Sequence, residues 1–186
     1  MPRSNPAGFV SMAPLLPPAV KGRASIQHWV PEPLSLLRAK IKGYNLTEGR
    51  TYCQLWINGD LWMSDTHDEM AANSITASAY GDVLILGLGI GMVLHRVLQN
   101  QSVKSVDVLE RDRDVSRLVW PHVGISPRAH LIIGDALKWT PKRRYDFIWL
   151  DIWLTPPERS EIRALRARYL PFKKRGGFIG QWEGNE

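Results

Sequence analysis

The sequence predicts an α/β fold, with a doubly wound and mostly parallel sheet of about five strands in the order 3-2-1-4-5. From residue 82 onward, short runs rich in Val, Ile and Leu alternate with segments of helical periodicity. This alternation is typical of parallel strands joined by helical crossovers. The first run leads directly into Gly87-Leu88-Gly89-Ile90-Gly91, and glycines between a strand and a helix let backbone approach a ligand.

Residues 23–80 are expected to form a small N-terminal β-hairpin and helix appendage. The pair Asn58-Gly59 between two apolar runs is the strongest short signal for a hairpin. Pro33 at one end and Gly43 at the other favour a helix between them. We expect Ser64 or Asp65 to cap a second helix. The expected elements are strands at 25–30, 51–57 and 60–63 and helices at 32–42 and 64–77.

Residues 81–186 are expected to form the ligand-binding domain. Its expected strands lie at 82–87, 103–109, 129–133, 145–150 and 178–182, and its helices at 91–99, 112–119 and 157–169. The sequence ends at Glu186, just after the fifth strand, so we expect a sheet with a shortened C-terminus and an open edge. A second subunit in a homodimer, or the N-terminal arm, could cover this edge.

Composition limits the class of protein. A length of 186 residues suits one domain with a small appendage. The single cysteine, Cys53, excludes a disulfide framework and a cysteine-rich metal site, so we expect it to pack in a strand and expect no metal. No apolar run reaches the ~18 residues of a membrane span. The proline-rich residues 1–22 resemble a disordered arm more than a signal peptide, and a cytoplasmic protein is expected.

The chain is basic, with a formal net charge of +6 and a pI near 9.7. The positive charge is concentrated in residues 141–144, in the arginines of the last expected helix and in residues 173–175. Such charge forms either a solvated face or a surface for a phosphate-bearing partner. Nucleic acid is therefore one candidate partner.

Acidic residues follow three of the expected strands, where ligands bind in open α/β sheets. Glu110 ends the second strand and could accept both hydroxyls of a ribose. Asp135 follows the third strand and could accept from an adenine amino group, or only cap a turn. Asp151 ends the fourth strand between Trp149 and Trp153, where it could hold an amine, orient a nucleophile or cap the next loop.

The glycine run differs from the dinucleotide fingerprint G-x-G-x-x-G, because Met92 occupies the place of the last glycine. A side chain there hinders the close packing and pyrophosphate approach found in NAD enzymes. NAD binding is therefore the weakest of the nucleotide hypotheses.

Taken together, the motifs resemble a class I S-adenosylmethionine-dependent methyltransferase of the spermidine synthase-like branch. The resemblance extends over about residues 54–183 and implies a Rossmann-like domain with S-adenosylmethionine as cofactor. It implies these cofactor-binding residues: Gly87, Gly89, Gly91, Glu110, Arg111, Gly134, Asp135, Ala136 and Asp151. Residues 58–70 resemble the gate segment of that family, so the helix expected at 64–77 is called the gate helix. The resemblance also implies that Asp151, with Asp65 or Glu69 from this segment, holds the methionine amine or orients the acceptor. Trp62, Trp149 and Trp153 are expected either to wall the site or to pack in the core.

Several residues differ from the pattern of the polyamine synthases, at positions that bear on which reaction is catalysed. Their aspartate within the glycine loop is here Ile90, and their glutamine after the hairpin turn is Trp62. His67 replaces the tyrosine of their Tyr-x-Glu gate, while Glu69 remains. We therefore expect a methyltransferase with an unidentified acceptor. Two alternatives stay open: an aminopropyltransferase that uses decarboxylated S-adenosylmethionine, and a non-catalytic nucleoside- or nucleic-acid-binding module.

Overall fold

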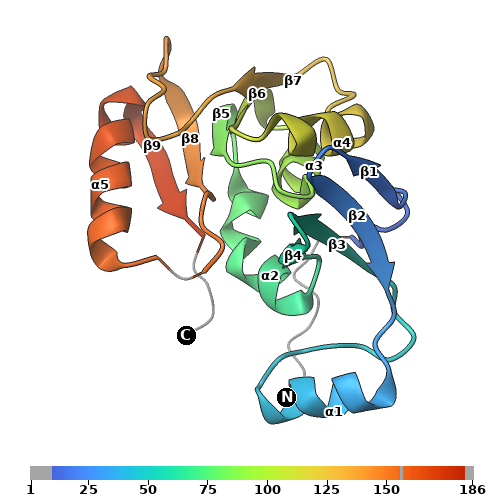
Figure 1. The fold of residues 1–186 in the computed structure, drawn as a ribbon. Coiled ribbons are helices and arrows are strands. Elements are labelled where there is room, and N and C mark those ends of the chain that lie inside the picture. The colour runs from blue at the N-terminus through green and yellow to red at the C-terminus, as the bar shows by residue number, and fades with distance from the viewer. Residues whose placement is uncertain (1–9, 156, 183–186) are drawn as a thin grey trace.

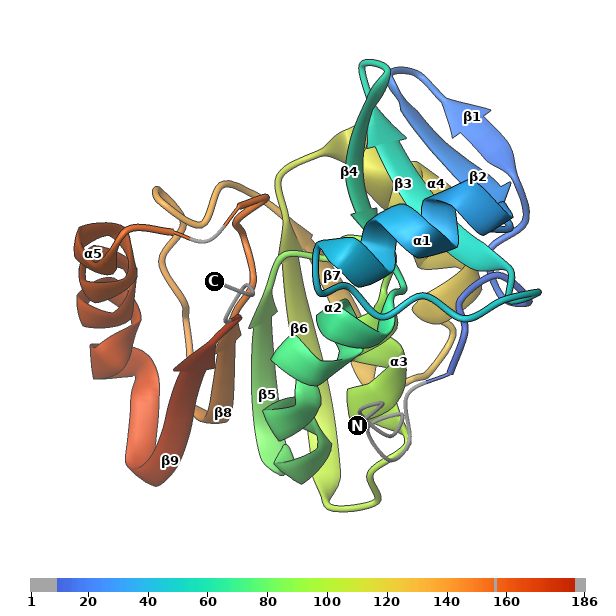
Figure 2. The same cartoon turned by 90° about the horizontal axis from the view of Figure 1, so that it is seen from below.

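The computed structural model describes residues 10–155 and 157–182. They form two sheets that lie side by side (Figure 1). A four-stranded antiparallel sheet has the order β1-β2-β3-β4, and a five-stranded parallel sheet has the order β7-β6-β5-β8-β9. In Figure 2 the blue and teal N-terminal strands lie at the end of the parallel sheet that is remote from β9.

The parallel sheet confirms the expected α/β fold and its strand order. Its strands are β5 (Gly81–Leu86), β6 (Val103–Glu110), β7 (Ala129–Ile133), β8 (Tyr145–Leu150) and β9 (Lys173–Gln181). All four neighbouring pairs are parallel. The fifth strand begins at Lys173, earlier than expected, because the backbone passes Gly176 at a positive φ and continues after a register shift against β8.

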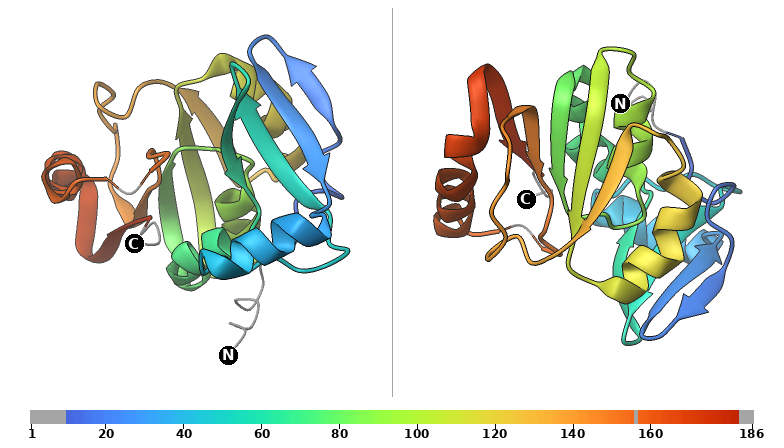
Figure 3. Two further views of the ribbon diagram at one scale, coloured as in Figure 1. Left: turned by 60° about the horizontal axis from the view of Figure 1, so that its bottom comes forward. Right: turned by 90° about the horizontal axis from the view of Figure 1, so that it is seen from above.

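Helices cover both faces of the parallel sheet. They are α3 (Met92–Leu98), α4 (Arg113–Val123) and α5 (Arg159–Tyr169), followed by the 3₁₀ turn η2 (Leu170–Phe172). Val83 and Ile85 of β5 belong to the same apolar cluster as α3 and α4, while Leu84 and Leu86 belong to the cluster of α5. This alternation explains why a central parallel strand is apolar throughout. Figure 3 shows α5 at the opposite end of the parallel sheet from the N-terminal strands.

The N-terminal sheet contains the expected hairpin. Its strands are β1 (Ala19–Lys21), β2 (Ala24–Trp29), β3 (Tyr52–Ile57) and β4 (Asp60–Ser64), and α1 (Pro33–Ile41) lies between β2 and β3. Asn58 and Gly59 both have positive φ, as a tight hairpin turn requires. Cys53 is buried in β3, and burial raises the pKa of its thiol to about 12, which suits a packing residue.

The gate helix differs from the prediction at both ends. Helix α2 (His67–Ala72) begins after Thr66, whose hydroxyl accepts a hydrogen bond from the Glu69 N–H. The expected cap at Ser64 or Asp65 is therefore wrong, because β4 continues to Ser64 and the chain turns one residue later. A 3₁₀ turn, η1 (Ser74–Ser78), replaces the second half of the expected helix.

Residues 10–22 are packed rather than disordered, so the expected boundary of the arm at residue 22 is wrong. Met12 and Leu16 are fully buried in the main apolar cluster, and β1 pairs with β2. Burial of these two large apolar side chains helps to hold the proline-rich segment on the rest of the protein. The rest of the expected arm, residues 1–9, lies outside the described residues.

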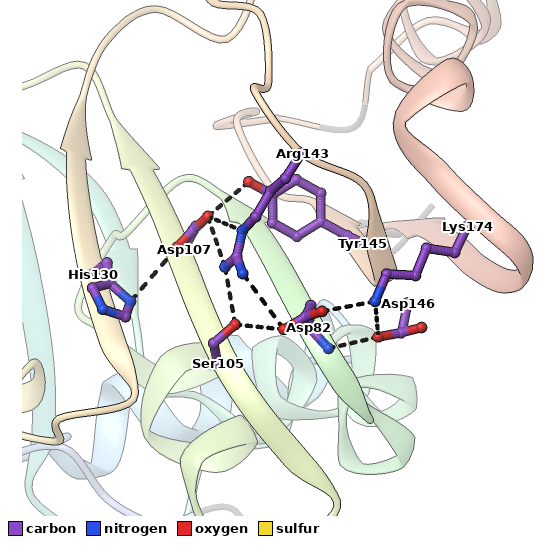
Figure 4. Close-up of polar contacts among 8 residues, drawn as sticks. All are labelled: Asp82, Ser105, Asp107, His130, Arg143, Tyr145, Asp146 and Lys174. Atoms are coloured by element: carbon purple, nitrogen blue, oxygen red, sulfur yellow. Dashed lines mark hydrogen bonds and ion pairs between the residues drawn. The ribbon is translucent and has the colours of Figure 1, made fainter.

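Some of the basic residues form ion pairs on the surface of the protein, near the amino-terminal ends of the parallel strands (Figure 4). Arg143 contacts Asp82 and Asp107, and Lys174 Nζ lies 2.7 Å from Asp82 and 2.8 Å from Asp146. These pairs join β5, β6, β8 and β9. They also place acidic side chains beside Arg143 and Lys174.

Within the described residues, none of the helices is both long and apolar enough to cross a membrane. The same residues contain no cluster of three or more His, Cys, Asp or Glu side chains that could bind a metal ion.

Candidate functional site

A cavity of about 540 Å³ lies beyond the carboxyl ends of the parallel strands, where α/β sheets bind ligands. Its wall is formed by the ends of β5, β6, β7 and β8, by the β3–β4 hairpin and by α2. All but two of the sequence-predicted site residues line it: Gly87, Gly89, Glu110, Arg111, Gly134, Asp135, Ala136, Asp151 and Glu69. The exceptions are Gly91 and Asp65.

The glycine loop brings the end of β5 against the end of β8. A Cβ atom at Gly87 would overlap the carbonyl oxygen of Asp151, and the residue has a φ of +100°. Gly91 does not line the cavity. It begins α3 at a φ of +75°, and a Cβ there would overlap Val123 of α4. Gly91 therefore has a packing role here, and its expected contact with a cofactor stays a prediction.

Glu110 is fixed at the cavity by two backbone donors. Its Oε2 accepts from the Leu88 N–H at 2.9 Å and its Oε1 from the Asp112 N–H at 2.7 Å. Desolvation raises the pKa of Glu110, and these two hydrogen bonds oppose that shift. Each carboxylate oxygen has a second lone pair, so the side chain can still accept from two ligand hydroxyls.

Asp135 lines the cavity and also caps a turn, so both of the roles left open by the sequence are compatible with its position. Its Oδ1 accepts from the Leu137 N–H at 2.9 Å. The Oδ2 atom makes no hydrogen bond to the described residues and remains available as an acceptor.

Asp151 lines the cavity without capping the loop that follows it. Its backbone N–H donates to the Leu86 carbonyl at 2.8 Å, whereas its carboxylate makes no hydrogen bond to the described residues. Desolvation raises the pKa of Asp151 well above its ordinary value, and the charges of Glu69 and Glu110 raise it further. A cationic ligand would relieve this burial of negative charge.

Glu69 reaches the cavity from α2. Desolvation raises its pKa to about 7, against the opposing effects of the Trp182 and Asn73 side chains. Asn73 Nδ2 donates to Glu69 Oε1 at 3.1 Å. The Trp182 indole N–H also favours the charged carboxylate, although its geometry falls short of a hydrogen bond.

Asp65 has a structural position, which does not fit the catalytic role that we expected. It is fully buried, and its carboxylate accepts from the Cys53 N–H at 2.7 Å, the Met12 N–H at 2.7 Å and the Ser11 hydroxyl at 3.0 Å. These bonds join the N-terminal segment to β3. The direction of the chain after β4 therefore brings Glu69, but not Asp65, to the cavity.

Trp62 and Trp153 line the cavity, and Trp149 is buried in the core. The structure also adds residues that sequence reasoning missed. Trp182 lines the cavity from the segment after β9, and Arg23 reaches it from the β1–β2 turn, with its Nη2 atom 2.8 Å from Asp112 Oδ2. No local pattern distinguishes these two residues, because only long-range packing brings them to the site.

The cavity can hold a nucleoside by its geometry. Gly87 and Gly89 offer backbone without side chains, the Glu110 carboxylate faces the same space, and Asp135 provides an acceptor one strand further along. The cavity volume lies within the range of small-molecule sites.

Comparison with curated sequences gives relatives of one kind. The polyamine aminopropyltransferase of Pyrobaculum arsenaticum is 30% identical over 176 residues, which cover 84% of this chain and 58% of the relative. Spermine synthase of Arabidopsis thaliana is 31% identical over 120 residues, or 56% of this chain and 33% of the relative. The motifs and the site agree with these matches. The resemblance to the spermidine synthase-like proteins that the motifs indicate is therefore confirmed.

This spermidine synthase-like chain spans little more than half the length of the Pyrobaculum arsenaticum relative and less of the others. No family model matches it. Among solved structures, the N-methyltransferase NodS from Bradyrhizobium japonicum is 13% identical, with a TM-score of 0.49 over 60% of this chain and 62% of that one. At this similarity the match adds nothing to the assignment.

Proposed function

We propose that this chain binds S-adenosylmethionine in the cavity and transfers its methyl group to an acceptor that is still to be identified. The observation that carries the proposal is the Glu110 carboxylate, held by the N–H groups of Leu88 and Asp112 at the wall that Gly87 and Gly89 share. This arrangement suits a ribose beside close-approaching backbone.

When bound, S-adenosylmethionine supplies a methyl group made electrophilic by its sulfonium. The residues of the chain bind and orient it. Glu110 would accept from the ribose hydroxyls and Asp135 from the adenine amine. Asp151 and Glu69 would attract the cationic part of the ligand or the acceptor, and Trp62 and Trp153 would exclude water.

Methyl transfer is favoured by the glycine loop and the hairpin. Ile90, which replaces an aspartate of the polyamine synthases, is fully buried in the apolar core and does not line the cavity. No carboxylate from this loop therefore reaches the ligand. Trp62, in place of a glutamine, adds an apolar ring to the cavity wall.

Aminopropyl transfer from decarboxylated S-adenosylmethionine is the second candidate. Glu69 and Asp151 both line the cavity, their pKa values are raised, and neither forms an ion pair among the described residues. Such a pair of carboxylates would suit a polyamine ammonium group. The names of the curated relatives point in the same direction.

A nucleic-acid partner remains a third candidate because the positive charge is segregated. Residues 138–175 contain eleven of the 24 basic residues and four of the 18 acidic ones, so they carry +7 while the rest of the chain carries −1. Within residues 138–175, the exposed basic residues that form no ion pair among the described residues are Lys138, Lys142, Arg144, Arg159, Arg163 and Arg175. A non-catalytic nucleic-acid-binding module would show salt-dependent RNA or DNA affinity without transferase turnover.

Calorimetry of the full chain with S-adenosylmethionine, S-adenosylhomocysteine and decarboxylated S-adenosylmethionine tests the proposal. We expect binding of the first two and weaker binding of the third. Glu110→Ala should abolish most of this affinity, while the exposed Glu48→Ala serves as the matched control. Absence of binding at millimolar ligand would refute the proposal, and putrescine-dependent release of methylthioadenosine would favour the second candidate.

A further inference from the structure

Asn73 lies at the C-terminal end of α2 and is fully buried. Its side-chain oxygen accepts from the Trp149 indole N–H at 2.8 Å. Its side-chain nitrogen donates at 3.1 Å both to the Glu69 backbone carbonyl and to Glu69 Oε1. A buried amide with both ends occupied has one orientation, because a flip would place donor against donor and acceptor against acceptor.

Trp149 is a rigid partner for this amide. It lies in β8, the strand that Asp151 directly follows, and is 2% exposed. Its ring stacks on Phe147, with centroids 6.5 Å apart and planes 26° apart. The orientation of Asn73 is therefore set by the parallel sheet, although Asn73 itself lies at the end of α2.

We propose that Asn73 is a positioning residue, which holds the Glu69 carboxylate in the cavity that Asp151 also lines, and that Trp149 anchors it. This role rests on the proposed function, because it matters only if the cavity binds a cationic ligand. Helix α2 has only six residues, which alone would define the direction of the Glu69 side chain poorly. Asn73 connects this helix to β8, the strand that Asp151 directly follows.

The electrostatics around Glu69 agree with this role. The groups that face it are Asn73 on its own segment, Trp182 after β9 and Asp151 after β8, which is itself influenced by Glu110 of β6. Desolvation raises the pKa of Glu69 to about 7, and the N–H donors of Trp182 and Asn73 oppose this rise. Loss of the Asn73 donor would leave the charged form less stable, so the carboxyl would retain its proton to higher pH.

A purely structural role is the alternative. Asn73 caps the C-terminus of α2 through its backbone N–H, and its side chain could do no more than satisfy buried groups. Asn100 offers a matched comparison, since its Nδ2 donates to the carbonyls of Ala77 at 3.2 Å and Ala79 at 2.8 Å and it does not line the cavity. A structural asparagine affects stability, whereas a positioning residue also changes the titration of Glu69.

The test compares Asn73→Asp, Trp149→Phe and the control Asn100→Asp in the full chain. Carboxyl ¹³C NMR follows the titration of Glu69 in the ligand-free protein, with Glu69→Gln to assign the signal. Calorimetry at several pH values then gives the affinity for S-adenosylmethionine and for S-adenosylhomocysteine, whose sulfur is uncharged.

We expect Asn73→Asp to raise the midpoint of Glu69 by about one pH unit or more, because a donor is replaced by an acceptor. Trp149→Phe should shift it in the same direction by less, and Asn100→Asp should leave it unchanged. The pH at which S-adenosylmethionine affinity is half-maximal should move with the Glu69 midpoint.

An unchanged Glu69 midpoint in both Asn73→Asp and Trp149→Phe would overturn the proposal, as would an equal shift in Asn100→Asp. If Asn73→Asp fails to fold, the Glu69 midpoint measured in Trp149→Phe still tests the proposal. If the wild-type chain binds neither ligand but the midpoint moves as expected, the proposed function fails while the positioning of Glu69 by Asn73 stands.

Discussion

Replacing Glu69 by glutamine should make folding stability less dependent on pH. Glutamine keeps an oxygen that accepts from Asn73 Nδ2 but cannot ionise. In the wild-type protein, desolvation raises the pKa of Glu69 from an ordinary value of 4.5 to about 7. The folded and the unfolded protein therefore release the Glu69 proton at different pH values.

The sign follows from proton binding in the two states. Below about pH 4.5 Glu69 is protonated in both the folded and the unfolded protein, and it contributes no pH dependence. Between this value and about pH 7 the unfolded chain releases the proton while the folded protein retains it, so stability falls as pH rises. At 1.36 kcal/mol per unit, the full fall amounts to about 3 to 4 kcal/mol.

Urea unfolding followed by tryptophan fluorescence at pH 5 and pH 8 measures this effect. We expect the stability of Glu69→Gln relative to wild type to increase by about 2 to 3 kcal/mol between the two pH values. Glu48→Gln, an exposed glutamate, is the control and should show no such increase. Equal pH dependence of Glu69→Gln and wild type would refute the idea that burial keeps Glu69 protonated near neutrality.

Three further substitutions separate binding, chemistry and folding. Glu110→Ala should weaken S-adenosylhomocysteine binding by about 1.5 to 3 kcal/mol, measured by calorimetry; unchanged affinity with a lower melting temperature would make Glu110 a structural residue. Asp151→Asn should bind ligand nearly normally while turnover falls by about 10²-fold, whereas a collapse of binding would assign Asp151 to the methionine amine. Asp65→Asn should lower the free energy of unfolding by about 3 kcal/mol, because an amide nitrogen would face the N–H donors that the carboxylate now satisfies. Its ligand affinity should stay near the wild-type value in calorimetry, and a selective loss of affinity would return Asp65 to the site.

Local patterns were enough to predict the parallel sheet and the carboxylates that line the cavity at the ends of its strands. Apolar runs alternating with helical segments indicate parallel strands joined by right-handed crossovers, and Glu110, Asp135 and Asp151 lie at or just after the ends of three of those strands. Because parallel strands end at one edge of a sheet, residues at these positions must lie near one another. The Asn58-Gly59 hairpin was also predictable, since its turn chemistry is local.

Tertiary structure alone decided which gate carboxylate faces the cavity. Asp65 and Glu69 are four residues apart and chemically alike, yet Asp65 satisfies the N–H groups of Met12 and Cys53 while Glu69 meets the amide of Asn73. These bonds join segments distant in sequence, including the residues expected to be disordered. Periodicity reports which face of an element is buried, but not which distant segment packs against it. The direction of a side chain at the end of a short helix is therefore set by its remote partners, which here include Trp149 of the parallel sheet.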